Sequence, residues 1–510
     1  MKLIKKIAAI MFAFMMVVSM SCNVKAVEGT SPATEETGTI KINNAIPEQT
    51  YTIYKILDLE SYSPKEENGK ETGNFAYKPS SEWESFIKGE NVRDKYFIFD
   101  GEYVSWKENA DPAAFAKLAL DYAKQNSSII KTFKVEKAPA ASAEQATTTV
   151  TFSVLDLGYY LVDSSVGTLC SLDTTKPTVE IKEKNGVPSV DKKVSNSKTG
   201  TFDTSSTASI GDTVYFKTTI TAQPGAQNYV LHDKMDAGLT FNESSVKAIL
   251  NKNETKKDTE LTATYYSVVT SNLEDTDPKC TFHIEFTPKL CESLKANDTI
   301  TVTYSATLNE NAVIAGEGNK NATWLKYGEN NNLETTHPTT DTKTFEMHVF
   351  KFYKDKKNSD KETGLADAVF TLSKKSDGTE PIKLTKTNEN SNIYKVNNNG
   401  MITDITTPGD GKFTIQGLGA GTYYLTETKQ PSGYNKLSGP VTVVIDENGK
   451  VMVKKGANLE DATEVKVENK TGTVLPSTGG TGTTMIYLIG GALVLGSGVV
   501  LATKRRVKNK

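Results

Sequence analysis

The sequence predicts an all-β protein made of three immunoglobulin-like β-sandwich domains in tandem, arranged as an elongated rod. Three observations lead to this prediction. Thr, Val, Tyr and Asn are frequent, apolar and polar residues alternate over short stretches, and Gly, Asn and Asp separate these stretches. At roughly 150 residues per domain, the chain of 510 residues is long enough to give each sandwich its own core.

The first residues of the chain are typical of an export signal. Lys2, Lys5 and Lys6 precede an apolar stretch at 7–20, and the small residues around Ala26 suit signal peptidase. We therefore expect a signal peptide at 1–26 and a mature chain that begins at residue 27.

The first domain is expected at 27–185. Asp111 suits a helix N-cap and Pro112 suits the first helical position, so one helix is expected after them, with Phe115 among its apolar residues. The strands expected in this domain alternate in polarity and are 39–43, 50–57, 149–155, 158–163 and 178–182.

The second domain is expected at 186–342 and the third at 343–472. Apolar residues alternate along 214–220 and 300–308, as in strands with one buried face. A weak internal repeat links the first and third domains. Their sequences Gly-Tyr-Tyr-Leu-Val-Asp, ending at Asp163, and Gly-Thr-Tyr-Tyr-Leu-Thr-Glu, ending at Glu427, predict related sandwiches.

Three polar residues of the third domain fall on apolar strand faces. Because strand residues alternate between two faces, Lys351, Glu427 and Asn469 each share a face with neighbouring apolar residues. Burial would lower the pKa of the lysine and raise that of the acid. A neutral amine can attack a carboxamide, and a protonated acid can polarise its carbonyl and relay protons to the ammonia that leaves. The pattern predicts a Lys351–Asn469 isopeptide bond with Glu427 as the catalytic acid.

The second domain shows the same arrangement at Lys192, Asp233 and Asn321. The same reasoning predicts a Lys192–Asn321 bond with Asp233 in the catalytic role. The alternative is that these residues lie at strand ends, where polar side chains reach solvent, and that their shared parity is a coincidence.

Residues 473–510 have a distinct composition. The pentapeptide Leu475, Pro476, Ser477, Thr478 and Gly479 is expected to stay extended and accessible, because proline neither continues a helix nor donates to a sheet. The apolar run 485–502 has no charge, and as a helix it would be about 27 Å long, close to the ~30 Å hydrocarbon core. We therefore expect a transmembrane helix followed by a basic cytoplasmic tail.

Composition excludes several function classes. The formal net charge is −3, and the removal of two basic ends makes the mature chain more acidic, which argues against nucleic-acid binding. The four histidines are scattered, no Cys/His spacing fits zinc, and neither a nucleophile elbow nor a phosphate-binding loop is present. No enzyme, cofactor or metal is expected. The mature cysteines are odd in number; Cys280 and Cys291 could pair, and Cys170 remains.

Four stretches resemble proteins of the Gram-positive cell surface. Residues 473–510 resemble a cell-wall sorting signal with the LPXTG motif that sortases read. The run Tyr-Leu-Thr-Glu-Thr-Lys-Gln-Pro-Ser-Gly-Tyr at 424–434 resembles the E-box of pilins. The stretch 348–355 resembles the first strand of CnaB-type domains, which places the bonding lysine at Lys351 rather than Lys354. The stretch 321–327 resembles the Asn-x-Ala-x-Leu-x-Tyr strand of middle pilin domains, with a threonine in place of the alanine.

This resemblance implies a major pilin whose subunits a sortase joins covalently, with cleavage between Thr478 and Gly479. In such pilins a lysine after a Val-x-Val-Tyr-Pro motif receives the threonine of the next subunit. Here Val179, Ile181 and Lys184 fit that motif, but Lys182-Glu183 replaces Tyr-Pro. Lys184 is therefore the expected acceptor, and Lys182 and Lys176 stay open as alternatives.

The partners that the resemblance implies are other copies of the chain, a pilin-class sortase, a housekeeping sortase, peptidoglycan and minor pilins. The expected location is a surface pilus attached to the cell wall, after a transient membrane tether. The alternative function is a monomeric wall-anchored adhesin that binds a host surface ligand; a secreted hydrolase is disfavoured because no catalytic constellation is found. Asp163 occupies the E-box-like position of the first domain, but it lacks clear Lys and Asn partners, so no bond is expected there.

Overall fold

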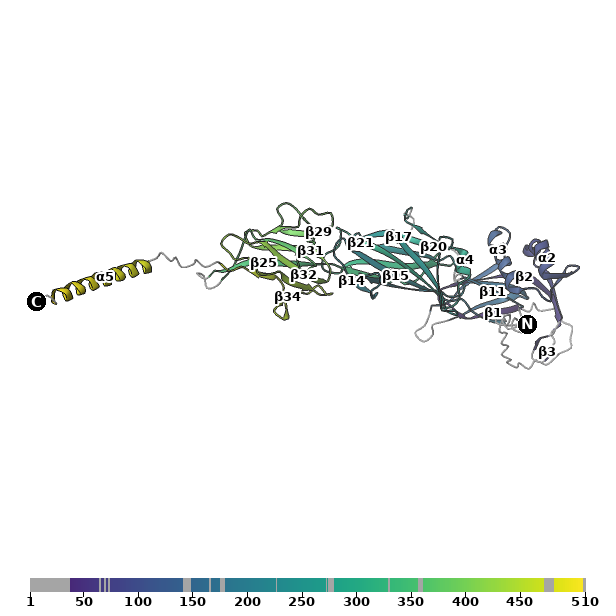
Figure 1. The fold of residues 1–510 in the computed structure, drawn as a ribbon. Coiled ribbons are helices and arrows are strands. Elements are labelled where there is room, and N and C mark those ends of the chain that lie inside the picture. The colour runs from purple at the N-terminus through teal and green to yellow at the C-terminus, as the bar shows by residue number, and fades with distance from the viewer. Residues whose placement is uncertain are drawn as a thin grey trace. The chain divides into compact units, whose positions relative to one another are not determined.

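A computed structural model describes residues 37–63, 66–67, 70–71, 74–140, 148–164, 167–174, 179–225, 227–271, 273, 279–328, 331–355, 361–471 and 481–507. Strands dominate these residues, as Figure 1 shows, and the all-β prediction is confirmed. The expected signal peptide, Lys176 and the pentapeptide at 475–479 lie outside the described residues.

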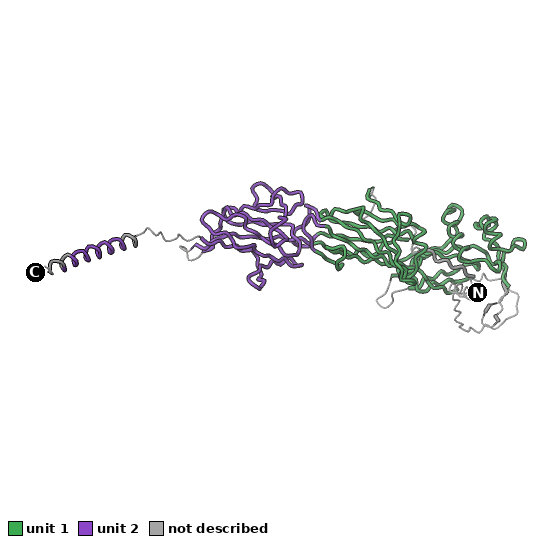
Figure 2. The backbone as a smooth tube through the Cα atoms, viewed as in Figure 1, with its two compact units in different colours: residues 1–206, 213–307, 319–342 green, residues 207–212, 308–318, 343–510 purple. Residues whose placement is uncertain are grey.

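The chain divides into two compact units, coloured green and purple in Figure 2. The first comprises 1–206, 213–307 and 319–342, and the second comprises 207–212, 308–318 and 343–510. Two short segments of the expected second domain thus belong to the unit that holds the expected third domain. The division into three domains at 27–185, 186–342 and 343–472 stays a prediction.

The N-terminal part of the first unit has a three-stranded sheet and a seven-stranded sheet. The smaller sheet has the order β12 (Val179–Lys182), β1 (Thr37–Ala45), β9 (Thr148–Asp156). The larger has the order β11 (Gly167–Thr174), β10 (Gly158–Ser164), β2 (Thr50–Ser63), β5 (Asn74–Pro79), β7 (Tyr103–Trp106), β6 (Phe97–Asp100), with β8 (Phe133–Lys137) on β2. β3 (Glu66–Glu67) and β4 (Lys70–Glu71) form a separate pair.

The expected helix of this region is confirmed as α3 (Pro112–Gln125). The Asp111 carboxylate accepts hydrogen bonds from the amides of Ala113 and Ala114 at 3.0 and 3.2 Å, which satisfies two free donors of the first turn. Phe115 is fully buried in an aromatic core with Trp83 and Tyr96. The short helices η1 (Ser81–Trp83), α1 (Glu84–Lys88) and α2 (Glu90–Tyr96) were not predicted.

The remainder of the first unit is built on two further sheets. One has the order β13 (Ser189–Ser195), β15 (Thr213–Thr221), β21 (Thr299–Leu308), β17 (Leu239–Lys252), β18 (Lys257–Glu260). The other has the order β14 (Ser205–Thr207), β24 (Thr339–Lys343), β22 (Asn319–Tyr327), β16 (Val230–Met235), β20 (Phe282–Phe286), β19 (Tyr266–Val269), with β23 (Leu333–Glu334) on β22. A short helix, α4 (Pro288–Glu292), follows β20.

The second unit has two six-stranded sheets. One has the order β26 (Lys361–Gly364), β25 (Phe345–Asp355), β31 (Lys412–Leu418), β29 (Ile393–Val396), β28 (Leu384–Lys386), and β36 (Val465–Glu468) pairs with β25 in parallel. The other has the order β30 (Ile405–Thr406), β27 (Val369–Ser373), β32 (Gly421–Lys429), β33 (Val441–Ile445), β34 (Val451–Lys455), β35 (Asn458–Asp461).

The C-terminal apolar run lies in helix α5 (Thr481–Val507), so the expected helix is present. The prediction that it crosses a membrane is not supported, because no helix within the described residues is both long enough and apolar enough to do so.

Candidate functional site

The first candidate site lies between the two later sheets of the first unit. Strand alternation turns Lys192 of β13 and Tyr304 of β21 inward from one sheet, and Asp233 of β16 and Asn321 of β22 inward from the other. All four side chains are buried, with exposed fractions of 0–3%. The inward parity predicted for Lys192, Asp233 and Asn321 is therefore correct.

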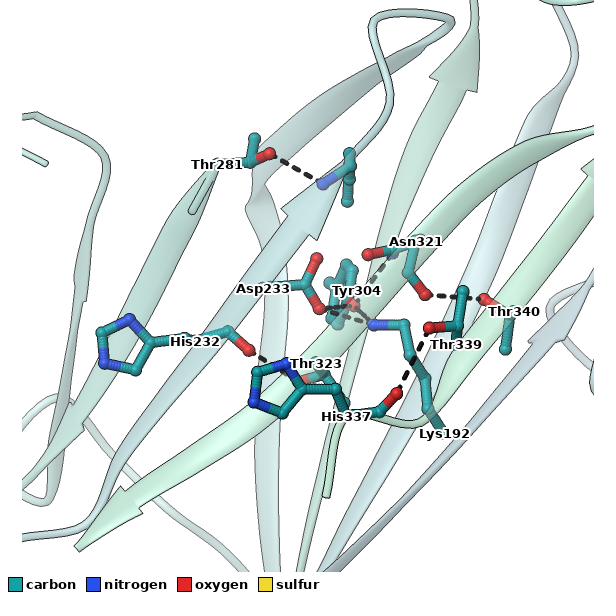
Figure 3. Close-up of polar contacts among 11 residues, drawn as sticks. Lys192, His232, Asp233, Thr281, Tyr304, Asn321, Thr323, His337, Thr339 and Thr340 are labelled. Carbon is teal, nitrogen blue, oxygen red and sulfur yellow. Dashed lines mark hydrogen bonds and ion pairs between the residues drawn. The ribbon is translucent and has the colours of Figure 1, made fainter. Parts of the chain in front are cut away.

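A compact hydrogen-bond network joins these four residues (Figure 3). The Lys192 amine lies 2.5 Å from Asp233 Oδ2 and also contacts the Tyr304 hydroxyl. That hydroxyl donates to Asp233 Oδ2 and accepts a hydrogen bond from Asn321 Nδ2 at 3.2 Å. The phenol thus connects the amine, the acid and the amide.

Burial controls the protonation of this site. It lowers the pKa of Lys192, and the nearby Asp233 carboxylate only partly opposes this effect. Burial likewise raises the pKa of Asp233, against the opposing effect of Lys192. The pKa of Tyr304 is raised well above its ordinary value by burial and by Asp233, so its hydroxyl keeps its proton. The site favours a neutral amine beside a protonated acid.

Tyr304 was not recognised as a site residue from the sequence. It lies in an alternating strand whose other inward residues are apolar, so it reads as a core aromatic residue. A signal was nevertheless present, because a buried phenol needs a hydrogen-bond partner and its strand faces three polar residues of the same core.

The second candidate site lies in the second unit. Lys351 of β25, Glu427 of β32 and Asn469, which follows β36, are 0–2% exposed, so their predicted inward parity is also correct. The Lys351 amine lies 3.3 Å from Glu427 Oε1, and Asn469 Nδ2 donates to the same oxygen at 3.0 Å. The other carboxylate oxygen accepts from the amide of Leu437 at 2.8 Å. The acid therefore bridges the amine and the amide directly.

The surroundings of Lys351 also favour its neutral form. Burial lowers the pKa of its amine, partly against the effect of Glu427. The amine lies 5.6 Å from the ring centre of Phe370. Apart from its 3.3 Å contact with Glu427 Oε1, the buried Lys351 amine has no hydrogen-bond partner among the described residues, and buried Asn469 Oδ1 has none there. Buried polar groups of this kind destabilise the fold.

The expected acceptor lysine lies just beyond β12. This strand runs parallel to β1, with Val179 opposite Ile40 and Ile181 opposite Ile42. Lys182 and Lys184 are both exposed, whereas Glu183 is buried and accepts hydrogen bonds from the amides of Lys184 and Asn185 at 2.9 and 2.8 Å. The glutamate that replaces the proline of the motif thus fixes the backbone that presents Lys184.

Asp163 of the first domain is buried, and its Oδ2 lies 3.5 Å from the amine of Lys124 on α3. This lysine comes from a surface helix rather than from a first strand, unlike Lys192 and Lys351. The expectation of no isopeptide bond at Asp163 stays a prediction.

Comparison with known proteins gives two family matches. Residues 350–458 match the prealbumin-like fold domain of the SpaA family, and residues 467–510 match the LPXTG cell wall anchor motif. These matches agree with the resemblance at its two most specific stretches, the E-box region and the sorting signal, and they identify a protein anchored to the cell wall. No curated protein matches the chain.

Several solved structures are similar in fold. The T6 backbone pilin of serotype M6 Streptococcus pyogenes is 16% identical, with 87% of this chain and 95% of that chain covered and a TM-score of 0.47. The full-length major pilin SpaD of Corynebacterium diphtheriae is 18% identical, with 87% and 99% covered and a TM-score of 0.41. The pilus 2b backbone protein of group B streptococcus is 24% identical, with 57% and 100% covered and a TM-score of 0.39.

Proposed function

We propose that this cell-wall-anchored chain is the backbone subunit of a covalent pilus, stabilised inside its subunits by two Lys–Asn isopeptide bonds. The observation that carries the proposal is the pair of buried Lys–acid–Asn clusters in an exported chain that ends in an LPXTG anchor. The buried clusters supply the internal links, and the anchor supplies the reactive end.

The internal bonds form without an added reactant. The neutral lysine amine attacks the amide carbon of asparagine, and the protonated acid hydrogen-bonds the carbonyl oxygen as negative charge develops there. The acid gives its proton to the leaving nitrogen and takes one from the attacking nitrogen, so that it ends protonated as it began. One amide bond forms, one carbon–nitrogen bond breaks, and one ammonia leaves. Each bond forms once, so the protein is not an enzyme that turns over.

Polymerisation joins the C-terminal end of one mature chain to a lysine at the end of the first domain of the next. A sortase cleaves between Thr478 and Gly479, and the freed Thr478 carboxyl group joins the ε-amine of Lys184 on the next subunit. Exposure of Lys184 and the hydrogen bonds of Glu183 to the following backbone support this role. Pilin-class and housekeeping sortases, peptidoglycan and minor pilins are the remaining proposed partners.

Wall extracts provide the test. The wild-type protein should give a ladder of multimers that resists SDS, and Lys184→Ala should abolish the ladder while the monomer still reaches the wall. Lys182→Ala is the matched control, because Lys182 is also exposed and lies two residues away.

A full ladder from Lys184→Ala would assign the acceptor role to another lysine, with Lys182 tested next. A wild-type protein that is attached to the wall only as a monomer would overturn the pilin proposal and favour the adhesin.

A further inference from the structure

Two histidines and a cysteine meet on the first unit, away from the Lys192 network. His232 of β16 lies directly opposite His283 of β20 in the antiparallel pairing, and Cys280 precedes His283 by three residues. One potential ligand atom from each residue lies within 4.8 Å of those of the other two. Because β16 and β20 hydrogen-bond along this stretch, the backbone fixes the relative positions of the two histidines.

The hydrogen bonding of the two rings suits metal ligands. The Nδ1 atoms of His232 and His283 are both buried and have no hydrogen-bond partner among the described residues. The other nitrogen of His283, Nε2, lies 3.3 Å from Glu285 Oε1, a carboxylate contact that favours a proton on Nε2 and a lone pair on Nδ1. Two buried nitrogens without partners are costly unless a ligand satisfies them.

The environment of His232 fixes the orientation of its ring. The ring stacks on Trp324, with centroids 5.2 Å apart and planes 7° apart. An imidazole whose orientation is fixed in this way is prepared to bind a metal ion.

We propose that His232, Cys280 and His283 bind one divalent metal ion of the zinc class. Imidazole and thiolate ligands together select zinc over magnesium or calcium, which prefer oxygen. On binding, the Cys280 thiol releases its proton to solvent, a sulfur–metal bond forms, and no electron is transferred. Three protein ligands leave the fourth tetrahedral position to water.

The ion would join β20 to β16 at His232, on the face of β16 opposite to that of its sequence neighbour Asp233. Such a link stabilises the folded state only, because the unfolded chain does not hold the three ligands together. The sequence alone does not indicate this site, because Cys280-x-x-His283 is only half of a zinc pattern. The third ligand lies far away in the chain and reaches the site through strand pairing.

Titration of the purified full-length protein, stripped of metal by chelation, tests the proposal. Zinc should bind with a stoichiometry of one per chain. Cobalt(II), used as a spectroscopic probe, should give tetrahedral ligand-field bands and a sulfur-to-cobalt charge-transfer band. Cys280→Ser should abolish the charge-transfer band, and Glu285→Gln should weaken zinc binding about tenfold by removing support for His283.

Cys291→Ser is the matched control, since Cys291 is also a buried thiol but lies outside the cluster, and it should leave the spectrum unchanged. If Cys280→Ser fails to fold, the wild type still decides the question, because zinc should protect Cys280, but not Cys291, from alkylation in mild denaturant. The proposal is overturned if zinc binds without stoichiometry, if no charge-transfer band appears, or if zinc leaves the alkylation of Cys280 unchanged.

Discussion

The two Lys–acid–Asn clusters are similar in chemistry but differ in topology. Lys192 and Asn321 extend from different sheets, so a bond between them would tie one sheet to the other. Lys351 and Asn469 lie on or next to two neighbouring parallel strands, with Lys351 paired with Val467, so their bond would stay within one sheet. The proposed reaction therefore requires a dry site and a shared acid, and two different strand arrangements supply both.

The two acids are also held differently. Asp233 reaches Asn321 through the hydroxyl of Tyr304, whereas Glu427 contacts Asn469 directly. The shorter aspartate therefore uses a phenol as an extension, and the longer glutamate uses a backbone amide to fix its second oxygen. Bond formation at the Asp233 site should therefore depend on Tyr304 as well as on the acid, whereas bond formation at the Glu427 site has no such additional side chain.

Removal of the acid should have the largest effect. The wild-type ectodomain should be lighter than its sequence mass by two molecules of ammonia, and Asp233→Ala or Glu427→Ala should each restore one. Each variant loses a cross-link worth about 4–5 kcal/mol of chain entropy, and it keeps a buried lysine and asparagine without their acid. Intact mass and thermal unfolding measure both effects, together with faster cleavage by trypsin.

Asp163→Ala is the matched control, since Asp163 is a buried acid of the same unit as Asp233 and is not expected to support a bond. A wild-type deficit of three ammonia molecules would show that this expectation is wrong. No deficit at all would overturn the internal bonds and leave the two clusters as buried hydrogen-bonded groups.

The pH dependence of stability should distinguish the roles of acid and amide at the first site. In Asn321→Ala the Lys192–Asp233 pair holds one proton in the folded chain. In the unfolded chain, Lys192 and Asp233 together also hold one proton at any pH between their ordinary pKa values of 10.5 and 3.8. The pair therefore does not change the free energy of unfolding with pH in that range. In Asp233→Ala the folded lysine, whose pKa is lowered, binds fewer protons than the unfolded one.

Stability of Asp233→Ala should therefore rise with pH between the folded and unfolded pKa values of Lys192, by up to about 1.4 kcal/mol per pH unit. Denaturant unfolding at several pH values measures the slope, and the difference from Asn321→Ala cancels the other titrating groups. Equal slopes in the two variants would mean that Lys192 stays charged in the folded protein.

Strand alternation alone predicted which polar residues face inward, because period-two patterning is a local property of the chain. Lys192 and Asn469 were both found in this way, and both are buried. The pattern could not reveal which strands pair, so the grouping of His232 with Cys280 was missed.

Two further features also depend on distant parts of the chain. The segments 207–212 and 308–318 belong to the second unit because they pack there; for example, the amide of Ile210 donates to the carbonyl of Gly417 at 2.9 Å. The helices α1 and α2 are too short to show a helical period. The local sequence therefore predicted which strand faces are buried and where one capped helix begins. The remaining features depend on which strands pair and on how distant segments pack.

Tyr304→Phe should give the smallest change and the sharpest contrast between the sites. It removes the hydroxyl that connects Asp233 to Asn321 and leaves the ring in place. We expect the Lys192–Asn321 bond to form more slowly, by less than about 100-fold, because the acid itself remains. Intact mass of newly synthesised protein, sampled over time, should show a delayed loss of one ammonia, while the loss at Lys351–Asn469 proceeds at the wild-type rate in the same molecule.

That second bond is an internal control for folding. An unchanged rate would show that Asp233 reaches the amide without the phenol, and complete loss of the first bond would make Tyr304 as necessary as the acid.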